Sequence, residues 1–254
     1  MLSIKQRHEY ILDQLAKEGN VRVQDIADAL GVTGATVRKD LRLLESQHRL
    51  YRNHGSASAV KQKVVDLPVQ QKSFIRAAEK KRIAKAALGL ITENDAIIMT
   101  SGTTIEAMAH HLTAKGVLNV VTPSLRVGVT LSEKSNVNIM MLGGHLVLNS
   151  LSVRDSYAIK GLNNVKCSKL FFSCDGFDVD AGITTAFVEE ARLTDAMMRA
   201  ATQSILLADS SKLGKVGFGR ICDICKIDII ITDSELPEAV KTAIEDLGVE
   251  VIIA

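Results

Sequence analysis

Long hydrophobic runs are absent from this 254-residue chain. A membrane-spanning helix needs about 20 consecutive apolar residues, and no stretch approaches that length. The opening segment, MLSIKQRHEYILDQL, carries charges throughout and so lacks the apolar core of a secretory signal. Its spacing instead predicts an amphipathic helix from about Ser3 to Lys17. These absences predict a cytoplasmic protein that makes no contact with a membrane.

Cysteine is also scarce, with four residues in the whole chain. Cys222 and Cys225 form a C-x-x-C pair, which is compatible with half of a zinc site or with a redox pair. A tetrahedral zinc site needs two further ligands, and neither Cys167 with Cys174 nor any pair of histidines has the required spacing. The sequence therefore predicts reduced thiols beside core strands, with no metal ion and no cofactor.

A strongly basic overall charge is missing as well, because the formal net charge is only +2. The charge is unevenly distributed, however. Residues 1–63 carry a net +4, and residues 33–63 alone contain seven cations against two anions. Such a local concentration of positive charge in a small segment favours a nucleic-acid partner for that segment.

The segment 23–57 has the pattern of two short helices joined by a tight turn and followed by a basic hairpin. Ile26, Ala27 and Leu30 lie on one face of the first helix, and Gly31 ends it at low steric cost. Thr33 can cap the second helix, whose buried face is Val37, Leu41 and Leu44. This is the layout of a winged helix-turn-helix, which places its second helix in the DNA major groove.

The opposite face of the second helix combines small, hydroxyl and cationic side chains, as close approach to base edges and phosphates requires. We expect Arg38 and Lys39 to make the main contacts, Thr36 to reach base edges, and the remaining cations to bind phosphates. A solvated charged helix face is the alternative for these cations taken alone. The predicted DNA-binding residues are Thr33, Ala35, Thr36, Arg38, Lys39, Arg42, Arg49, Arg52 and His54.

The rest of the chain divides into a linker and a larger domain. We place the DNA-binding domain at residues 1–59, with its wing from about Arg49 to Ala59. Periodicity is lost from Ser56 to Lys72, and we expect a linker over residues 60–74 that is mobile until DNA or a partner subunit holds it. Residues 75–254 form the second domain.

In this second domain apolar strands alternate with amphipathic helices. Near-continuous apolar runs such as IDIIITD are typical of parallel strands buried on both faces, so the fold class is α/β and doubly wound. Helices are expected at 79–90, 103–114, 125–134, 187–201 and 238–247. Strands are expected at 96–100, 118–122, 137–142, 169–175, 204–209, 227–233 and 249–253.

Polar clusters follow three of these strands, where ligands bind in parallel sheets. Ser101-Gly102-Thr103-Thr104 opens a helix, whose amino-terminal N–H groups favour an anion. The segment 175–178, DGFD, offers paired carboxylates for sugar hydroxyls, and Lys212 adds a cation. Each cluster alone could be a routine cap or turn. Their convergence predicts a site for a phosphorylated sugar or polyol, formed by Ser101, Gly102, Thr103, Thr104, Gly144, Asp175, Asp178, Thr184 and Lys212.

Across nearly its full length the chain resembles the DeoR family of bacterial transcriptional regulators. The matching segments, in the family's order, are RHEYILDQL, VTGATVRKDLRLLE, YRNHGSA, KKRIAKAA, SGTT, VVTPS, MLGG, DGFD, DSSK and IDIIITD. The resemblance implies a winged-helix repressor of catabolic genes that a sugar phosphate releases from operator DNA. It also favours a homodimer or homotetramer. Two positions depart from the family pattern, Thr100 in place of Asp and Ser56 in place of Gly.

The second domain is also similar to ribose-5-phosphate isomerase, which carries comparable GTT, DGxD and DxSK segments. The isomerase pattern has a catalytic lysine in a KGGG stretch shortly after DGxD. Here the corresponding segment is 181–184, Ala-Gly-Ile-Thr, which has no lysine. This favours a sensor over the alternative of an isomerase-like enzyme fused to a DNA-binding domain. A winged-helix module that binds protein is a third possibility, disfavoured by the basic recognition face.

Overall fold

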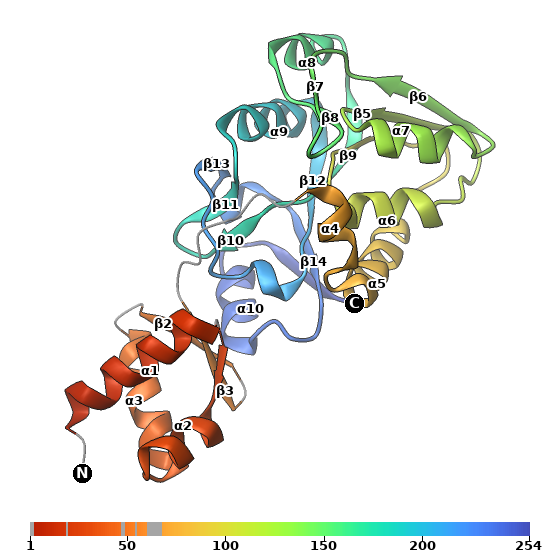
Figure 1. The fold of residues 1–254 in the computed structure, drawn as a ribbon. Helices are drawn as coiled ribbons and strands as arrows, with labels where there is room; N and C mark the ends of the chain where they lie inside the picture. The colour runs from red at the N-terminus through yellow and green to blue at the C-terminus, as the bar shows by residue number, and fades with distance from the viewer. Residues whose placement is uncertain (1–2, 19, 47–48, 54, 60–67) are drawn as a thin grey trace.

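The computed structural model describes residues 3–18, 20–46, 49–53, 55–59 and 68–254. The amino-terminal module contains three helices and a small antiparallel sheet with strand order β1-β3-β2 (Figure 1). This arrangement is the predicted winged helix-turn-helix. Its elements are α1 (Ile4–Glu18), β1 (Asn20–Arg22), α2 (Val23–Leu30), α3 (Gly34–Ser46), β2 (Leu50–Asn53) and β3 (Ser56–Ala59).

The turn between α2 and α3 is formed as the sequence predicts. Gly31 adopts a left-handed backbone conformation with φ of 61°, which glycine reaches without steric cost. The Thr33 hydroxyl accepts a hydrogen bond from the Thr36 amide at 3.2 Å and so caps α3. Val37, Leu41 and Leu44 are at most 1 % exposed. The buried face of α3 therefore fixes which of its side chains point outward.

One buried residue of α3 was not predicted. Asp40 is 5 % exposed, and its carboxylate accepts hydrogen bonds from Nε and Nη2 of Arg7 at 2.7 and 3.0 Å. Nε2 of His8, which lies on α1 as Arg7 does, is 3.4 Å from Oδ1 of Asp40. The ion pair joins α1 to α3. Its sequence signal is an acidic residue three positions after Val37, on the apolar stripe of α3.

The second domain is built on a seven-stranded sheet with order β15-β14-β12-β9-β4-β5-β6, in which every pairing is parallel. All seven predicted strands are present, with ends shifted by a few residues. The strands are β4 (Ala96–Met99), β5 (Leu118–Thr122), β6 (Val137–Met141), β9 (Cys167–Phe172), β12 (Ala201–Leu207), β14 (Ile229–Thr232) and β15 (Glu250–Ile253).

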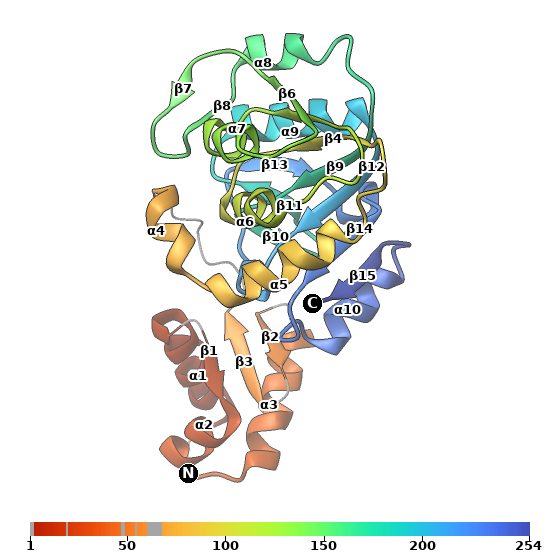
Figure 2. The same cartoon turned by 90° about the vertical axis from the view of Figure 1, so that its right-hand side faces the viewer.

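Helices cover both faces of this sheet, as the doubly wound prediction requires. α5 (Ala77–Leu88), α6 (Thr103–His111) and α7 (Leu125–Ser132) pack on one face, which Figure 2 shows. α9 (Val188–Ala200) and α10 (Glu238–Glu245) pack on the other. Along β4, Ile97 and Met99 join the first core and Ile98 joins the second. Alternate side chains of one strand thus supply two separate cores.

Several short elements were not predicted. A hairpin of β7 (Leu146–Val147) and β8 (Ser152–Val153) precedes α8 (Ser156–Gly161). β10 (Gly176–Asp178), β11 (Gly182–Thr185) and β13 (Gly219–Cys222) form a second small sheet. Two 3-10 turns, η1 (Ser210–Lys212) and η2 (Ile224–Lys226), complete the domain. None of the helices in the described residues is both long and apolar enough to span a bilayer.

The linker prediction is wrong over part of its length. Residues 69–74 form α4 (Val69–Phe74), which is held on the second domain. The amide of Val69 donates to the carbonyl of Asn149 at 3.0 Å, and Lys72 pairs with Asp175 at 3.1 Å. These contacts, rather than apolar periodicity, fix the helix. Residues 60–67 lie outside the described residues.

Candidate DNA interface and effector pocket

The outward face of α3 carries the predicted recognition residues. Arg38, Lys39 and Arg42 are exposed, and none of the ion pairs formed by the described residues includes them. The hydroxyls of Thr33 and Thr36 lie 3.0 Å apart at the front of the helix, beside the exposed Ala35. Cations without carboxylate partners on a helix whose other face is buried suit contact with a polyanion.

The wing places its cations differently. Arg49 is exposed, whereas Nη1 of Arg52 donates to Oε2 of Glu45 on α3 at 3.2 Å. The backbone amide of Arg52 also donates to Glu45, at 3.1 Å. Arg52 is therefore held against α3 and shares its charge with a carboxylate. His54 lies outside the described residues.

Replacing Arg52 with alanine should weaken specific and non-specific DNA binding together. One lost phosphate contact is expected to reduce the slope of log K against log salt by about one unit. Gel-shift titrations at several salt concentrations measure this slope. An unchanged slope would mean that Arg52 serves only to anchor the wing to Glu45.

A pocket lies beyond the carboxyl ends of β4, β9 and β12, which are neighbours in the sheet. From β4 the sheet continues to one side with β5 and β6, whereas β9 and the later strands lie on its other side. The strand order therefore reverses at β4 and β9, and α/β sheets bind ligands at such a topological switch point. The pocket has about 740 Å³ of empty volume, including its open mouth. Six predicted effector residues line it: Ser101, Gly102, Thr103, Thr104, Asp175 and Lys212.

Part of the pocket lining is suited to an anion. The first turn of α6 begins after Gly102 and has amide N–H groups with no acceptor within the helix. Gly102 has a φ of 116°, and a Cβ there would come within 2.3 Å of the Ser173 hydroxyl. Only glycine therefore allows this turn. Lys212 and Lys80 add two cations to the lining, and neither forms an ion pair among the described residues.

Lys80 was not predicted as a site residue. It is 5 % exposed, and its Nζ donates to the backbone carbonyl of Lys72 at 2.6 Å. Burial lowers the pKa of Lys80 to about 8. Its sequence signal is a cation three residues before the buried Ile83, on the apolar face of α5. A buried ammonium group at a pocket wall is stabilised when an anion fills the pocket.

The pKa of Lys80 predicts how phosphate binding depends on pH. Binding should weaken as pH rises through about 8, because the ammonium loses its proton while a phosphate monoester is already a dianion. In the absence of ligand, Lys80 makes the stability of the fold depend on pH in the opposite direction, so that stability rises with pH. The folded-state pKa lies below the unfolded value, so the charge of Lys80 opposes folding at pH 7, and this penalty fades as pH rises past 8.

Calorimetry of a sugar phosphate between pH 7 and pH 9 tests the first of these effects. Lys80→Arg is the matched control, because a guanidinium keeps its charge over this range and should flatten the profile. Equal affinity of the wild type at both ends of the range would show that Lys80 does not contact the anion.

The pocket lining also carries carboxylates. Asp175 accepts hydrogen bonds from Lys72 at 3.1 Å and from the Thr185 hydroxyl and the Ala186 amide at 3.0 Å. Burial acts to raise the pKa of Asp175, but Lys72 and Lys212 hold it below the usual range. Burial, with the charge of Asp175, raises the pKa of Glu190 to about 7. These groups offer acceptors for ligand hydroxyls.

Three predicted effector residues lie outside the pocket lining. Asp178 caps a turn, where Oδ1 accepts from the amides of Asp180 and Ala181 at 3.0 Å. The Thr184 hydroxyl is used within the small sheet, between Gly176 and Gly217. A Cβ on Gly144 would meet the Asp155 carboxylate at 2.4 Å. All three positions shape the surrounding loops, and the structure does not bring Asp178 to the pocket lining beside Asp175.

Asp175→Asn should weaken a sugar phosphate more than inorganic phosphate if Asp175 contacts sugar hydroxyls. The amide keeps the shape but presents a donor where the carboxylate accepts, at a cost on the order of 1 kcal/mol for a lost hydrogen bond. Calorimetry with both ligands measures the difference. Equal weakening of both would show that Asp175 positions Lys72 and Thr185 instead of contacting the sugar.

Sequence reasoning missed several pocket residues that come from elements folded over the strand ends. Arg154 lies after β8, with its guanidinium 3.7 Å from the centre of the Phe187 ring and 3.8 Å from Glu190. Glu190 stands in the first turn of α9, and nothing in its local pattern distinguishes it from a surface residue. The polar and charged lining residues missed are Lys72, Lys80, Asn149, Ser150, Arg154, Ser173, Glu190 and Asp209.

A winged helix-turn-helix module joined to a ligand pocket on a parallel sheet defines a ligand-responsive transcriptional regulator. Two family models match the chain, the DeoR-like helix-turn-helix domain over residues 7–63 and the DeoR C-terminal sensor domain over residues 75–234. The chain belongs to the DeoR family of transcriptional regulators.

Curated relatives extend over almost the whole chain. It is 34 % identical to the transcriptional regulator YulB of Bacillus subtilis, over 98 % of this chain and 96 % of that one. It is 33 % identical to a putative aga operon transcriptional repressor of Escherichia coli O157:H7, over 98 % and 93 %. Since these full-length relatives are regulators, the chain is a regulator and not an enzyme.

A solved ribose 5-phosphate isomerase A from Neisseria gonorrhoeae aligns with 53 % of this chain and 52 % of its own. The identity is 16 % and the TM-score 0.37, which is too low to support an inference about activity.

Proposed function

We propose that this protein represses a sugar-catabolism operon and leaves its operator when a phosphorylated sugar or polyol fills the pocket. The observation that carries the proposal is the composition of the pocket. Lys80, Lys212 and the first turn of α6 bring positive charge to its lining, and Asp175, Glu190 and Asp209 bring hydrogen-bond acceptors. A ligand with both a phosphate and several hydroxyls can use both kinds of group.

The similar repressor of Escherichia coli is named for the aga operon, which supports the repressor role for this chain. The exposed cations of α3 and the wing then hold operator DNA. We place the DNA-binding domain at residues 1–59 and the effector domain at 75–254, with α4 packed on the latter. Operators read as paired half-sites require a symmetric assembly, so the functional unit is a homodimer or homotetramer that acts in the cytoplasm.

A thermal-shift screen of pentose, hexose and polyol phosphates tests the effector class. A ligand at 100 times its dissociation constant stabilises the folded protein by about 2.7 kcal/mol, which is readily measured. The same sugars without phosphate are the matched controls. A compound that stabilises the protein should also release it from operator DNA in a gel shift. Stabilisation by the unphosphorylated sugars alone would contradict the proposed anion site.

A further inference from the structure

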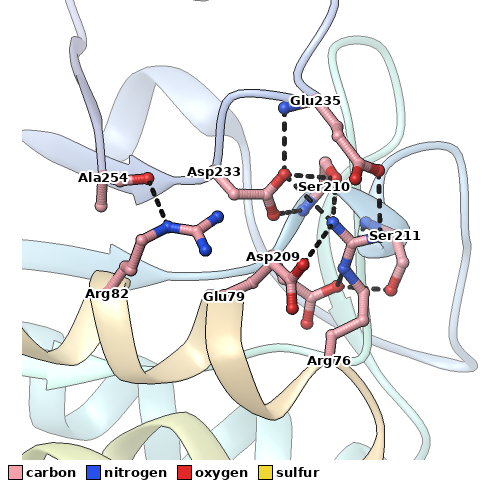
Figure 3. A network of polar contacts seen from close by, with 9 residues as sticks. All are labelled: Arg76, Glu79, Arg82, Asp209, Ser210, Ser211, Asp233, Glu235 and Ala254. Atoms are coloured by element: carbon pink, nitrogen blue, oxygen red, sulfur yellow. Dashed lines mark hydrogen bonds and ion pairs between the residues drawn. The ribbon is translucent and has the colours of Figure 1, made fainter.

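Arg76 stands between α4 and α5 and is bonded in several directions at once (Figure 3). Its backbone is left-handed with φ of 53°, an uncommon conformation for a residue other than glycine. Its guanidinium lies 3.5 Å from Asp209, 3.2 Å from Asp233 and 3.0 Å from Glu235. One cation thus joins three carboxylates from two different loops.

The first of these loops belongs to the effector pocket. Asp209 is 2 % exposed, lines the pocket and directly precedes η1, whose last residue is Lys212. Ser210, within the same turn, donates from its amide and its hydroxyl to Asp233, each at 2.8 Å. Any shift of the turn when Lys212 binds an anion therefore alters the hydrogen bonds of Asp233.

The second loop faces the DNA-binding module. Asp233 is fully buried and accepts from the Glu235 amide at 3.0 Å. The following residues, 234–239, line a surface hollow together with residues of α3 and the wing, among them Arg38 and Arg52. Glu235 on this loop and Glu238 at the start of α10 are acidic, whereas Arg38 is a predicted DNA contact. These carboxylates and the DNA phosphates are therefore both negatively charged, and both would face the same side of α3.

We propose that Arg76 is a positioning residue that transmits occupancy of the effector pocket, through Asp233 and Glu235, to the recognition helix and the wing. This inference rests on the proposed function and specifies how that site is read out. Asp233 is fully buried and is bonded both to Ser210 of the first loop and to Arg76, so a shift of Ser210 reaches the second loop through these contacts. Anion binding at Lys212 moves Ser210, and loop 234–239 follows and changes its contact with α3.

Hydrogen exchange of the full chain, with and without saturating inorganic phosphate, tests the transmission. In the wild type, phosphate should slow exchange in segment 101–106 at the pocket and change exchange in segment 233–239 by about 5-fold or more, the lower range of allosteric coupling. In Arg76→Gln the effect at 101–106 should persist and the change at 233–239 should fall by at least half, because only the direct hydrogen bonds from Ser210 to Asp233 remain.

Arg82→Gln is the matched control, because Arg82 lies on α5, which Arg76 directly precedes, and donates to the carbonyl of Ala254 at 3.2 Å (Figure 3). It should respond as the wild type does. Glu235→Gln provides a second test should Arg76→Gln fail to fold, since Glu235 is 65 % exposed on its side chain and its loss leaves no buried charge. This variant should keep the pocket response and lose at least half of the response at 233–239.

The other possible results each contradict the inference in a different way. If Arg76→Gln and Glu235→Gln both retain the full change at 233–239, the coupling does not pass through Arg76, and the inference fails while the proposed anion site is retained. If phosphate protects 101–106 in the wild type without any change at 233–239, the inference is also overturned. If phosphate leaves 101–106 unprotected, the proposed anion site itself fails, and the inference fails with it.

Discussion

Lys212→Ala should bind operator DNA as the wild type does but no longer respond to the effector. Lys212 lines the pocket and forms no ion pair among the described residues, so its charge is available to a ligand. A hydrogen bond to a charged group contributes about 1.5–3 kcal/mol, which corresponds to a roughly 10- to 150-fold loss of effector affinity. The expected phenotype is a repressor that inducer cannot release.

Gel shifts over a range of effector concentrations measure the response. Lys226→Ala is the matched control, because Lys226 ends the 3-10 turn η2 as Lys212 ends η1 but does not line the pocket. It should release operator at the wild-type effector concentration. If Lys212→Ala also does so, the phosphate lies elsewhere in the pocket or outside it.

The parallel sheet could be predicted because both faces of its central strands are buried. Runs such as Ile229–Thr232 then have no polar alternation, and helices with a single apolar stripe separate them. The small sheet of β10, β11 and β13 could not be predicted in the same way. Its strands are three or four residues long, and they are held by contacts such as Thr184 with Gly217 that join distant parts of the chain.

The pocket was predictable to the extent that strand ends form it. Residues directly after β4, β9 and β12 meet because those strands are neighbours. Lys72, Arg154 and Glu190 come instead from α4, the segment after β8 and α9, and only tertiary folding brings them to the strand ends. Asp178 shows the converse error. It belongs to a predicted motif, but the local turn uses its carboxylate.

Arg38→Ala should weaken operator binding by about 1–3 kcal/mol and relax specificity at the position that Arg38 reads, the range expected for an arginine bidentate to guanine. The physical reason is the position of Arg38 on α3. Its neighbour Val37 is buried and fixes the rotation of the helix, so that Arg38 is exposed. A phosphate contact alone would weaken all sequences equally. Comparison of the operator with single-base variants separates the two roles.

The matched control for Arg38→Ala is Lys17→Ala, which removes one positive charge from the same module at a site on α1 that pairs with Asp13. Because Lys17 already has a carboxylate partner on its own helix, its loss should change operator affinity far less than the loss of Arg38. Gel-shift titrations at one salt concentration compare the two variants directly. Equal effects would mean that only the overall charge of the module matters. An unchanged affinity in Arg38→Ala and in Arg52→Ala would remove the assignment of α3 and the wing as the DNA interface.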